Sequence, residues 1–431
     1  MTPTVAPHTL EPTFNGLGIA PNILDILGKL NFVVPTPIQH RAIPPGVAGK
    51  DVVGVAQTGT GKTLAFGIPL LQRLAGAGGR GLILVPTREL ALQVDETLAK
   101  IARPLGIRSA VFIGGASMGA QISALRRDPH VVIATPGRLL DHLAQKTIRL
   151  DKVEVLVLDE ADRMLDMGFW PQVKKIIAAA PKERQTMLFS ATLSPDIMQL
   201  ATAHMKLPLR IEVAPAGTTV EKVSQEFFVV RKEEKTRLLE KILSDYAGST
   251  LVFSRTKHGA KKVMRTVAAM GHTAAEIHGN RSLSQRKEAL EGFKNGRYRV
   301  LVATDIASRG IDVKGIELVV NYDLPMDSSD YVHRIGRTAR AGAKGHAISF
   351  AEPHQKRDIR DIERLIRKTV PISTLPALPP ARATPTSTYN DDRPRRFSRP
   401  QQRGFTPRGR SSFGSRPRRQ SPSRGPRRFS R

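Results

Sequence analysis

A short glycine-bearing run has the residue types of a phosphate-binding loop. Directly after the apolar run Val52–Val55, the sequence reads Ala56-Gln57-Thr58-Gly59-Thr60-Gly61-Lys62-Thr63. Backbone N–H groups in such a turn point at a phosphate, and the following helix adds the positive end of its dipole. The Lys62 ammonium can reach the β- and γ-phosphates, and the Thr63 hydroxyl can hold Mg²⁺. Although Ala56 replaces the usual first glycine, we predict a nucleoside triphosphate site formed by Gln57, Thr58, Gly59, Thr60, Gly61, Lys62 and Thr63.

An acidic string follows a second apolar run. Asp159-Glu160-Ala161-Asp162 comes directly after Val155–Leu158. Acidic residues at a helix start can merely favour the helix dipole. At the carboxyl end of a buried strand, however, they lie where open α/β sheets bind their ligands. We therefore predict that Asp159 holds Mg²⁺ and that Glu160 orients and deprotonates an attacking water.

Apolar runs alternate with helical stretches along most of the chain, which is typical of parallel sheets covered on both faces. We expect strands at Val52–Val55, Leu82–Val85, Val111–Ile113, Val131–Ile133, Val155–Leu158, Met187–Phe189, Phe227–Val230, Leu251–Phe253, Val300–Val302, Leu318–Val320 and Ala347–Phe350. We expect helices at Ile23–Leu30, Arg88–Ile101, Pro171–Ala180 and Glu352–Lys368. The fold class is therefore α/β with two sheet domains, of which the first carries the phosphate loop.

Composition sets the outer limits of the prediction. The 431 residues carry a net charge of +29 and no cysteine, which excludes disulfides and thiolate metal sites and favours a polyanionic partner. We find neither a signal peptide nor an apolar stretch of membrane-spanning length, and we expect a cytoplasmic protein. Residues 375–431 have too few apolar side chains for a core, so we expect a disordered basic tail. The remaining predicted parts are an N-terminal segment (1–42), a first domain (43–213), a linker (214–223) and a second domain (224–374).

Further motifs stand in a fixed order around these residues. They are Pro35-Thr36-Pro37-Ile38-Gln39, Pro86-Thr87-Arg88-Glu89-Leu90, Gly114-Gly115, Thr135-Pro136-Gly137-Arg138, Ser190-Ala191-Thr192, Ala303 to Asp312 and His333 to Arg340. With this set the chain resembles DEAD-box RNA helicases from Phe14 to Ile372. The resemblance implies a superfamily two helicase core of two tandem RecA-like domains that uses ATP and Mg²⁺. Asp159 to Met167 followed by Gly168-Phe169, the compact second domain and the basic tail are most similar to the bacterial RhlE-type members.

The resemblance assigns further residues to the nucleotide. Gln39, in the adenine-reading motif of the N-terminal segment, is expected to bind the adenine edge, because an amide offers both a donor and an acceptor. Phe32 is expected to stack on the ring, with ordinary core packing as the alternative, and Asp312 to touch the ribose. Arg337 and Arg340 are expected to act as arginine fingers, which can supply roughly 10³–10⁵ in rate; a basic surface helix is the alternative. The implied catalytic set is Lys62, Asp159, Glu160, Arg337 and Arg340.

The resemblance also implies an RNA interface, whose contacts to phosphate and sugar would position a strand without reading its sequence. Its residues would be Pro86, Thr87, Arg88, Gly115, Thr135, Pro136, Gly137, Arg138, Arg286 and Thr304. Ser190 and Thr192 are expected to couple Asp162 to His333, and so hydrolysis to domain closure. Asn31 and Ala339 replace usual glycines and Leu283 replaces a common Gln; of these, Leu283 puts one polar contact of the second domain in question.

The expected function is an ATP-dependent RNA helicase that locally unwinds short duplexes or remodels RNA–protein complexes. We expect a monomeric core that binds RNA, with ribosomal-precursor or RNA-decay complexes as the partners and no membrane. Two alternatives remain open. One is an ATP-gated RNA clamp with little unwinding, and the other is a DNA translocase of the same superfamily, against which the Gln39 motif and the acidic string argue.

Overall fold

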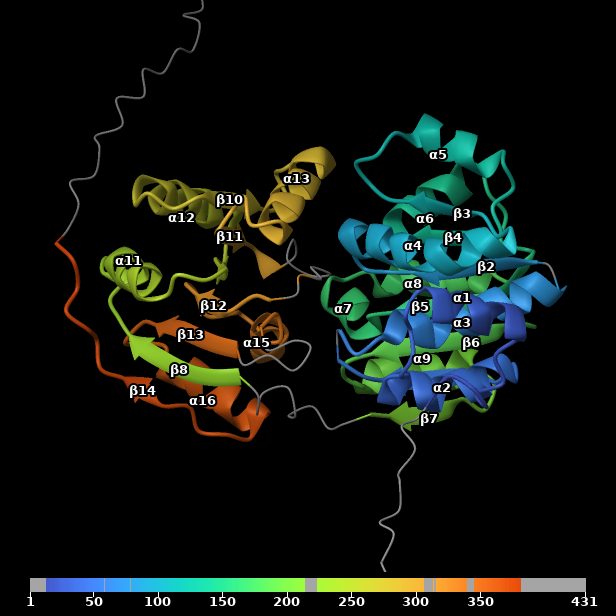
Figure 1. Ribbon diagram of the computed structural model, residues 1–431, viewed down its shortest axis with the longest axis horizontal. Helices are drawn as coiled ribbons and strands as arrows, with labels where there is room; N and C mark the ends of the chain where they lie inside the picture. The colour runs from blue at the N-terminus through green and yellow to red at the C-terminus, as the bar shows by residue number, and fades with distance from the viewer. Residues whose placement is uncertain are drawn as a thin grey trace, which may run out of the picture. The chain divides into compact units, whose positions relative to one another are not determined.

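The computed structural model describes residues 13–57, 59–77, 79–213, 223–305, 313, 315–338 and 345–380. This part of the chain contains two seven-stranded sheets, each with helices on its faces (Figure 1). Every strand pair in both sheets is parallel. The prediction of α/β domains built on parallel sheets is confirmed.

The first sheet has the strand order β3-β4-β2-β5-β6-β1-β7. Its strands are β1 (Val52–Val55), β2 (Arg80–Leu84), β3 (Ser109–Phe112), β4 (Val131–Ala134), β5 (Val153–Asp159), β6 (Gln185–Ser190) and β7 (Leu209–Glu212). Its helices are α1 (Pro21–Lys29), α2 (Pro37–Val47), α3 (Lys62–Ala77), α4 (Arg88–Ala102), α5 (Met118–Leu125), α6 (Pro136–Ala144), α7 (Ala161–Asp166), α8 (Trp170–Ala179) and α9 (Pro195–His204).

The second sheet has the strand order β10-β11-β9-β12-β13-β8-β14. Its strands are β8 (Val223–Val229), β9 (Thr250–Phe253), β10 (Ala274–Ile277), β11 (Val300–Ala303), β12 (Leu318–Asn321), β13 (Gly345–Ala351) and β14 (Ile372–Ser373). Its described helices are α11 (Lys235–Asp245), α12 (Lys257–Ala269), α13 (Leu283–Lys294), α15 (Ser328–Ile335) and α16 (Lys356–Ile366). Taken in chain order from its own first strand, this is the order of the first sheet.

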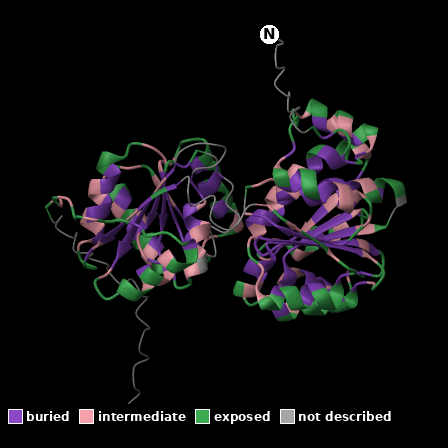
Figure 2. Cartoon of the chain, turned by 90° about the horizontal axis from the view of Figure 1, so that it is seen from below, coloured by how far each residue is buried: buried purple, intermediate pink, exposed green. Residues whose placement is uncertain are grey.

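Each sheet separates two apolar cores, because successive side chains of a strand point to opposite faces. In β1, Val52 packs into one cluster and Val53 into the other. In β9, Leu251 and Val252 divide in the same way. Figure 2 shows the buried strands between helices whose outer faces are exposed. These cores hold the carboxyl ends of the parallel strands at one edge, where α/β proteins bind ligands.

Several predicted boundaries were wrong. Strands β7, β10 and β14 were not expected, and β7 ends at Glu212, just before the predicted linker. Strand β8 begins at Val223, the last residue of the predicted linker, whereas residues 214–222 lie outside the described part. The closing helix begins at Lys356 instead of Glu352.

The start of the tail also needs adjustment. The description continues to residue 380, and Arg237 of α11 donates to the carbonyls of Leu378 (3.4 Å) and Pro379 (2.6 Å). Residues 375–380 therefore pack on the second sheet's domain, while the rest of the predicted tail lies outside the described residues. Among the described helices, none combines the length and the apolar character needed to cross a membrane.

Candidate functional site

The phosphate-loop sequence forms the turn between β1 and α3. Gly59 and Gly61 have φ angles of +87° and +92°, a left-handed conformation that glycine adopts without strain. A Cβ atom at Gly61 would lie 2.4 Å from Gln39 Nε2. Glycine at this position is therefore favoured by backbone conformation, and a side chain there would also displace the Gln39 amide. Thr58, the other predicted contact in this turn, lies outside the described residues.

Lys62, the first residue of α3, is 6% exposed. Its Nζ atom lies 4.0 Å from Asp159 Oδ1 and makes no hydrogen bond to any residue that the structure describes. A buried ammonium group is costly unless its donors are satisfied. Phosphate oxygens in the adjacent turn would satisfy them, so this side chain fits the predicted nucleotide.

The acidic pair lies where β5 ends. Asp159 and Glu160 are 3% and 2% exposed, and the Glu160 N–H donates to Asp159 Oδ1 at 2.9 Å. Burial raises the pKa of Asp159 to about 6, against the opposing charge of Lys62. Glu160 has a left-handed backbone (φ +53°), which costs energy in a residue other than glycine. The strain at this position is compatible with the predicted catalytic role of the acidic pair.

Glu160 is held by a partner that sequence reasoning missed. Arg163 NH1 donates to Glu160 Oε2 at 3.0 Å, and both side chains are almost fully buried. Burial alone would raise the pKa of Glu160, but the charges of Arg163 and Lys62 outweigh it and lower the pKa. The carboxylate is therefore ionised at neutral pH and can accept a proton. The available signal was the opposite charge three residues on, from the residue that precedes α7 to a residue in its first turn.

The oxygen ligands fit Mg²⁺, which prefers carboxylate and hydroxyl groups together with phosphates and water. Asp159 ends β5, and Thr63 follows Lys62 in the first turn of α3. In the described ranges, no group of three or more His, Cys, Asp or Glu side chains could hold a metal by itself. Asp159 and Thr63 would hold the ion together with the nucleotide, as carboxylates commonly do for Mg²⁺.

Gln39 joins α2 to the phosphate loop. Its Nε2 donates to the Gly61 carbonyl at 3.0 Å, and its Oε1 accepts from the Thr36 N–H at 2.9 Å. One amide hydrogen and one lone pair remain, which is what an adenine edge needs. Phe32 is 37% exposed and is not a core residue. The adenine contacts of both residues stay predictions.

The predicted coupling residues of the first sheet meet at Asp162. Its Oδ2 accepts from the N–H of Ala191 (2.9 Å) and of Thr192 (3.0 Å) and from the Thr192 hydroxyl (3.3 Å). The Ser190 hydroxyl accepts from the Asp162 N–H at 3.2 Å. The start of α7 is thereby tied to the end of β6. The link onward to His333 stays a prediction.

The predicted RNA residues of the first domain follow β2, β3 and β4, which are neighbours in the sheet. Thr87 caps α4 by accepting from the Leu90 N–H at 3.3 Å. The Arg88 guanidinium lies against the turn after β3, where a Cβ at Gly115 would be 2.2 Å from its NH1 atom. The left-handed φ of Gly115, +77°, favours glycine at that position, and the Arg88 side chain fills the space beside the pair.

Helix α6 joins the same group of loops. Thr135 precedes the helix, Pro136 is its first residue, and Gly137 and Arg138 complete the motif. Arg138 NH1 donates to the Ala116 carbonyl at 2.9 Å. The structure therefore brings together the first-domain residues Pro86, Thr87, Arg88, Gly115, Thr135, Pro136, Gly137 and Arg138.

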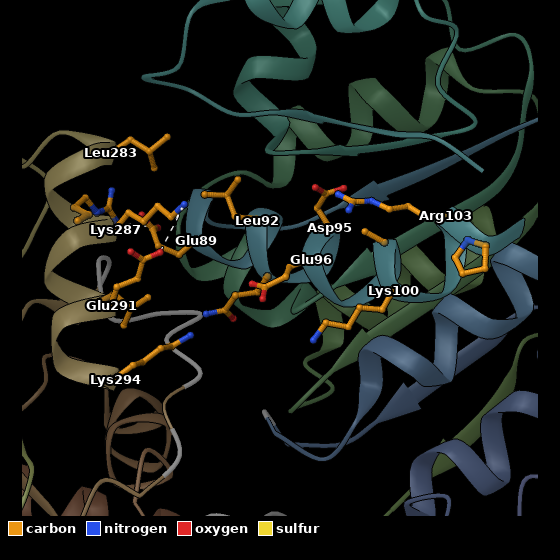
Figure 3. Close-up of a pocket in the computed structure, with 15 residues that line it drawn as sticks. Glu89, Leu92, Asp95, Glu96, Lys100, Arg103, Leu283, Lys287, Glu291 and Lys294 are labelled. Atoms are coloured by element: carbon orange, nitrogen blue, oxygen red, sulfur yellow. Dashed lines mark ion pairs between the residues drawn. The ribbon is translucent and has the colours of Figure 1, made fainter. Parts of the chain in front are cut away.

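The second-sheet residues have protein partners. Arg286 NH2 on α13 lies 2.8 Å from Glu89 Oε2 on α4, beside a hollow of about 670 Å³ (Figure 3). Burial raises the pKa of Glu89, against the opposing charge of Arg286. Arg286 is 7% exposed and Thr304, after β11, is 8% exposed. Their contacts with RNA stay predictions, and the Glu89 pairing was not foreseen.

The arginine-finger motif is described up to Thr338. Arg337 is 2% exposed and its Nε donates to the His333 carbonyl at 3.2 Å, while His333 Nδ1 lies 4.0 Å from Asp330 Oδ1. The predicted residues Asp312 and Arg340 lie outside the described residues, as does Ala339.

Comparison with known proteins identifies the family. The pattern of the DEAD/DEAH box helicases matches residues 36–200, and that of the helicase conserved C-terminal domain matches residues 234–342. The DEAD-box ATP-dependent RNA helicase CshA of Bacillus cereus is 40% identical over 369 residues, which cover 85% of this chain and 70% of that protein. This chain belongs to the DEAD-box family of RNA helicases. The ATP-dependent rRNA helicase RRP3 of Eremothecium gossypii is 42% identical over 377 residues, 85% of this helicase and 78% of RRP3.

Solved structures share the fold of this DEAD-box helicase. S. cerevisiae Dbp5 bound to RNA and ADP BeF3 matches with a TM-score of 0.76 at 30% identity, covering 84% of this chain and 95% of that one. Mss116p bound to ssRNA and AMP-PNP matches with a TM-score of 0.77 at 27% identity, covering 86% and 81%. The expected pair of RecA-like domains is confirmed.

Proposed function

We propose that this DEAD-box helicase hydrolyses ATP when RNA binds, and that it uses hydrolysis to separate short RNA duplexes or to remodel RNA–protein complexes. The observation that carries the proposal is the buried Lys62 ammonium beside Asp159 and Glu160, with no hydrogen-bond partner in the described ranges. The same sheet edge continues through β2, β4 and β3 into the loops of Thr87, Thr135 and Gly115. One edge therefore offers both a nucleotide site and a strand-binding surface.

Each nucleotide-site residue has one task in the proposed mechanism. Lys62 and the N–H groups of the phosphate loop hold the phosphates, and Asp159 and Thr63 are ligands for Mg²⁺, which neutralises phosphate charge when bound. The ionised Glu160 carboxylate orients water and accepts its proton. Arg337 supplies positive charge where the transition state develops negative charge.

RNA contact and hydrolysis are coupled through the strand ends. The loops after β2, β3 and β4 grip phosphate and sugar, so binding is largely independent of base sequence. Asp162 and its contacts at Ser190 and Thr192 join the acidic pair to the end of β6. We assign the onward link to His333, and the second-domain grip on RNA to Arg286 and Thr304.

Finer assignments rest on sequence features. Asp159 to Met167 followed by Gly168-Phe169, together with the basic C-terminal residues, favours an RhlE-type member. The absence of cysteine favours a reducing compartment such as the cytoplasm. RNA is the proposed partner of a monomeric core, with ribosomal-precursor or RNA-decay complexes as its setting.

ATPase activity with and without RNA, measured alongside displacement of one strand of a short duplex, tests the proposal. RNA-stimulated hydrolysis with strand displacement is the expected result. Stimulated hydrolysis without displacement would favour the ATP-gated clamp. Equal stimulation by single-stranded DNA would favour the DNA translocase.

A further inference from the structure

A buried polar pair lies behind two of the loops that we assign to RNA. His142 on α6 is fully buried, and Gln121, 5% exposed, is the buried residue of α5. Helix α5 follows the Gly114-Gly115 turn, and α6 follows the Thr135 turn. Neither His142 nor Gln121 belongs to the motifs assigned above.

Hydrogen bonds join the pair directly to the glycine turn. Gln121 Nε2 donates to the Ile113 carbonyl at 3.1 Å, so its Oε1 faces the His142 ring, with Nε2 at 3.2 Å. Since Oε1 can only accept, His142 Nε2 must carry the hydrogen. The opposite ring nitrogen lies 2.8 Å from the Thr147 hydroxyl. The same hydroxyl donates to the His142 carbonyl at 3.0 Å. Burial, helped by the charge of Arg138, lowers the pKa of His142 and favours the neutral ring.

The glycine turn is thereby attached to α6 at both ends. At its start, the Ile113 carbonyl is bound through Gln121 to His142. At its end, the Ala116 carbonyl accepts from Arg138 NH1 at 2.9 Å. Gly114 and Gly115 lie between these two attachments, so α6 fixes their place relative to its own N-terminus.

Helix α5 is attached to α6 by a buried hydrogen bond, whereas neighbouring helices are usually held together by apolar packing. The other residues of α5 are half-buried or exposed, with Ala124 and Leu125 packed against the apolar core, and Gln121 is the fully buried attachment of the helix. A hydrogen-bonded chain of fixed length sets a distance more narrowly than apolar contact, and removing one member leaves a buried partner unsatisfied. Fixing a binding loop in advance lowers the entropy lost when a ligand binds.

We propose that His142 and Gln121 are positioning residues for RNA backbone binding. They hold the Gly114-Gly115 turn at the spacing from α6 that suits neighbouring phosphates of one strand. The inference rests on the proposed function and adds a determinant of RNA affinity that acts through the first-domain loops. His142 and Gln121 therefore affect how tightly RNA binds and not the rate of ATP hydrolysis once RNA is bound.

The test uses the full-length protein and compares the RNA concentration at half-maximal ATPase with the rate at saturating RNA. Gln121→Leu and His142→Asn should raise the half-maximal RNA concentration about 5- to 10-fold, because one net hydrogen bond is worth about 1 kcal/mol. The saturated rate and the affinity for ATP without RNA should stay within about twofold of the parent. His142→Gln should restore most of the loss, because a glutamine amide reaches the Nε2 position whereas asparagine reaches only the Nδ1 position.

Gln185→Leu is the matched control. Gln185 is an equally buried glutamine of the first domain, and its Nε2 donates to the carbonyls of Gly46 (2.7 Å) and Lys50 (2.9 Å) at the opposite end of the sheet. It should lower the melting temperature but leave RNA half-saturation unchanged. Equal shifts in Gln121→Leu and Gln185→Leu, or a lower saturated rate with unchanged half-saturation, would overturn the inference. A parent without RNA stimulation would instead overturn the proposed function, and the inference with it.

Discussion

The two sheets of this helicase have the same strand order, but the buried lysines at corresponding places beside them have different partners. Lys62 is the first residue of α3, after β1, and Lys235 is the first residue of α11, after β8, which holds the corresponding place in its sheet. Both side chains are buried. Lys235 Nζ lies 3.1 Å from Asp323 Oδ1 and 3.0 Å from Glu352 Oε1, whereas Lys62 Nζ lies 4.0 Å from Asp159 Oδ1.

The neighbouring carboxylates differ in the same sense. Burial dominates at Asp159 and raises its pKa to about 6. At Asp323, burial is outweighed by the Arg255 N–H and the Lys235 ammonium, and the pKa is lowered. Lys235 is therefore satisfied by two carboxylates of its own domain, whereas the Lys62 ammonium is left to a ligand. The unsatisfied buried charge of Lys62 supports our proposal that the first sheet, and not the second, holds the nucleotide phosphates.

The largest effect is expected at Glu160. Glu160→Gln should abolish turnover while retaining ATP and RNA binding, because an amide cannot accept the proton of water. Glu352→Gln is the control. It removes one carboxylate partner of Lys235 in the second domain and should keep most of the turnover. RNA-stimulated ATPase of the two variants is the measurement. Near-normal turnover in Glu160→Gln would show that Glu160 is not the general base.

The second sheet's contribution to catalysis should be confined to the transition state. Arg337→Ala should lower the catalytic rate about 10³-fold, at the lower end of the effect of arginine fingers, with little change in nucleotide affinity. Arg357→Ala, an exposed change on α16, serves as control. Loss of nucleotide affinity with an unchanged rate would place Arg337 in ground-state binding instead.

A smaller effect is expected at Gln39, which binds the phosphate loop in this structure. Gln39→Ala should weaken ATP binding by about 1–3 kcal/mol, because the Gly61 carbonyl and the adenine both lose a partner. Binding of ADP and of inorganic triphosphate to the variant distinguishes the two losses, because only ADP carries the adenine. If Gln39 reads the base, the affinity for ADP should fall more than the affinity for triphosphate. Equal use of GTP and ATP by the parent would contradict adenine recognition.

The smallest effect on the motor is expected from the C-terminal residues. Residues 391–431 contain 14 Arg against 2 Asp, and we expect them to bind RNA independently of sequence. Truncation should follow Ala381, because Leu378 and Pro379 bind Arg237. If about five phosphates are neutralised, the slope of log affinity against log salt should flatten by about 3–4 units. An unchanged slope would refute tethering, and a lower saturated rate would place these residues in the motor.

Sequence reasoning succeeded where the signal was local. The phosphate loop and Asp159-Glu160 each follow a continuous apolar run, so the strand and the turn after it could be read together. Strands β7 and β10 were not predicted, because they carry Arg210 and Glu276 among apolar residues. Both strands lie at sheet edges. An edge strand needs no continuous apolar run, because it is less buried than a central one.

Long-range contacts could not be predicted from one sequence. Gln39 binds the Gly61 carbonyl across 22 residues, and Arg286 pairs with Glu89 on a distant helix. Residue type indicates that such groups need partners, but only the fold determines which partners they reach. The contrast between Lys62 and Lys235 could not be predicted either. Both lysines begin a helix, and only their distant carboxylate neighbours distinguish them.

The most direct test of the account is nucleotide binding by Lys62→Met and Lys235→Met, measured by calorimetry with Mg²⁺ and a non-hydrolysable ATP analogue. Lys62→Met should lose at least about 100-fold in affinity, the coupling of a charge-assisted contact, without a lower melting temperature. Lys235→Met should bind the nucleotide like the parent but lose about 3 kcal/mol of stability, because Asp323 loses its ammonium partner. Parent-like nucleotide affinity in Lys62→Met, or equal losses of affinity in both variants, would contradict the account.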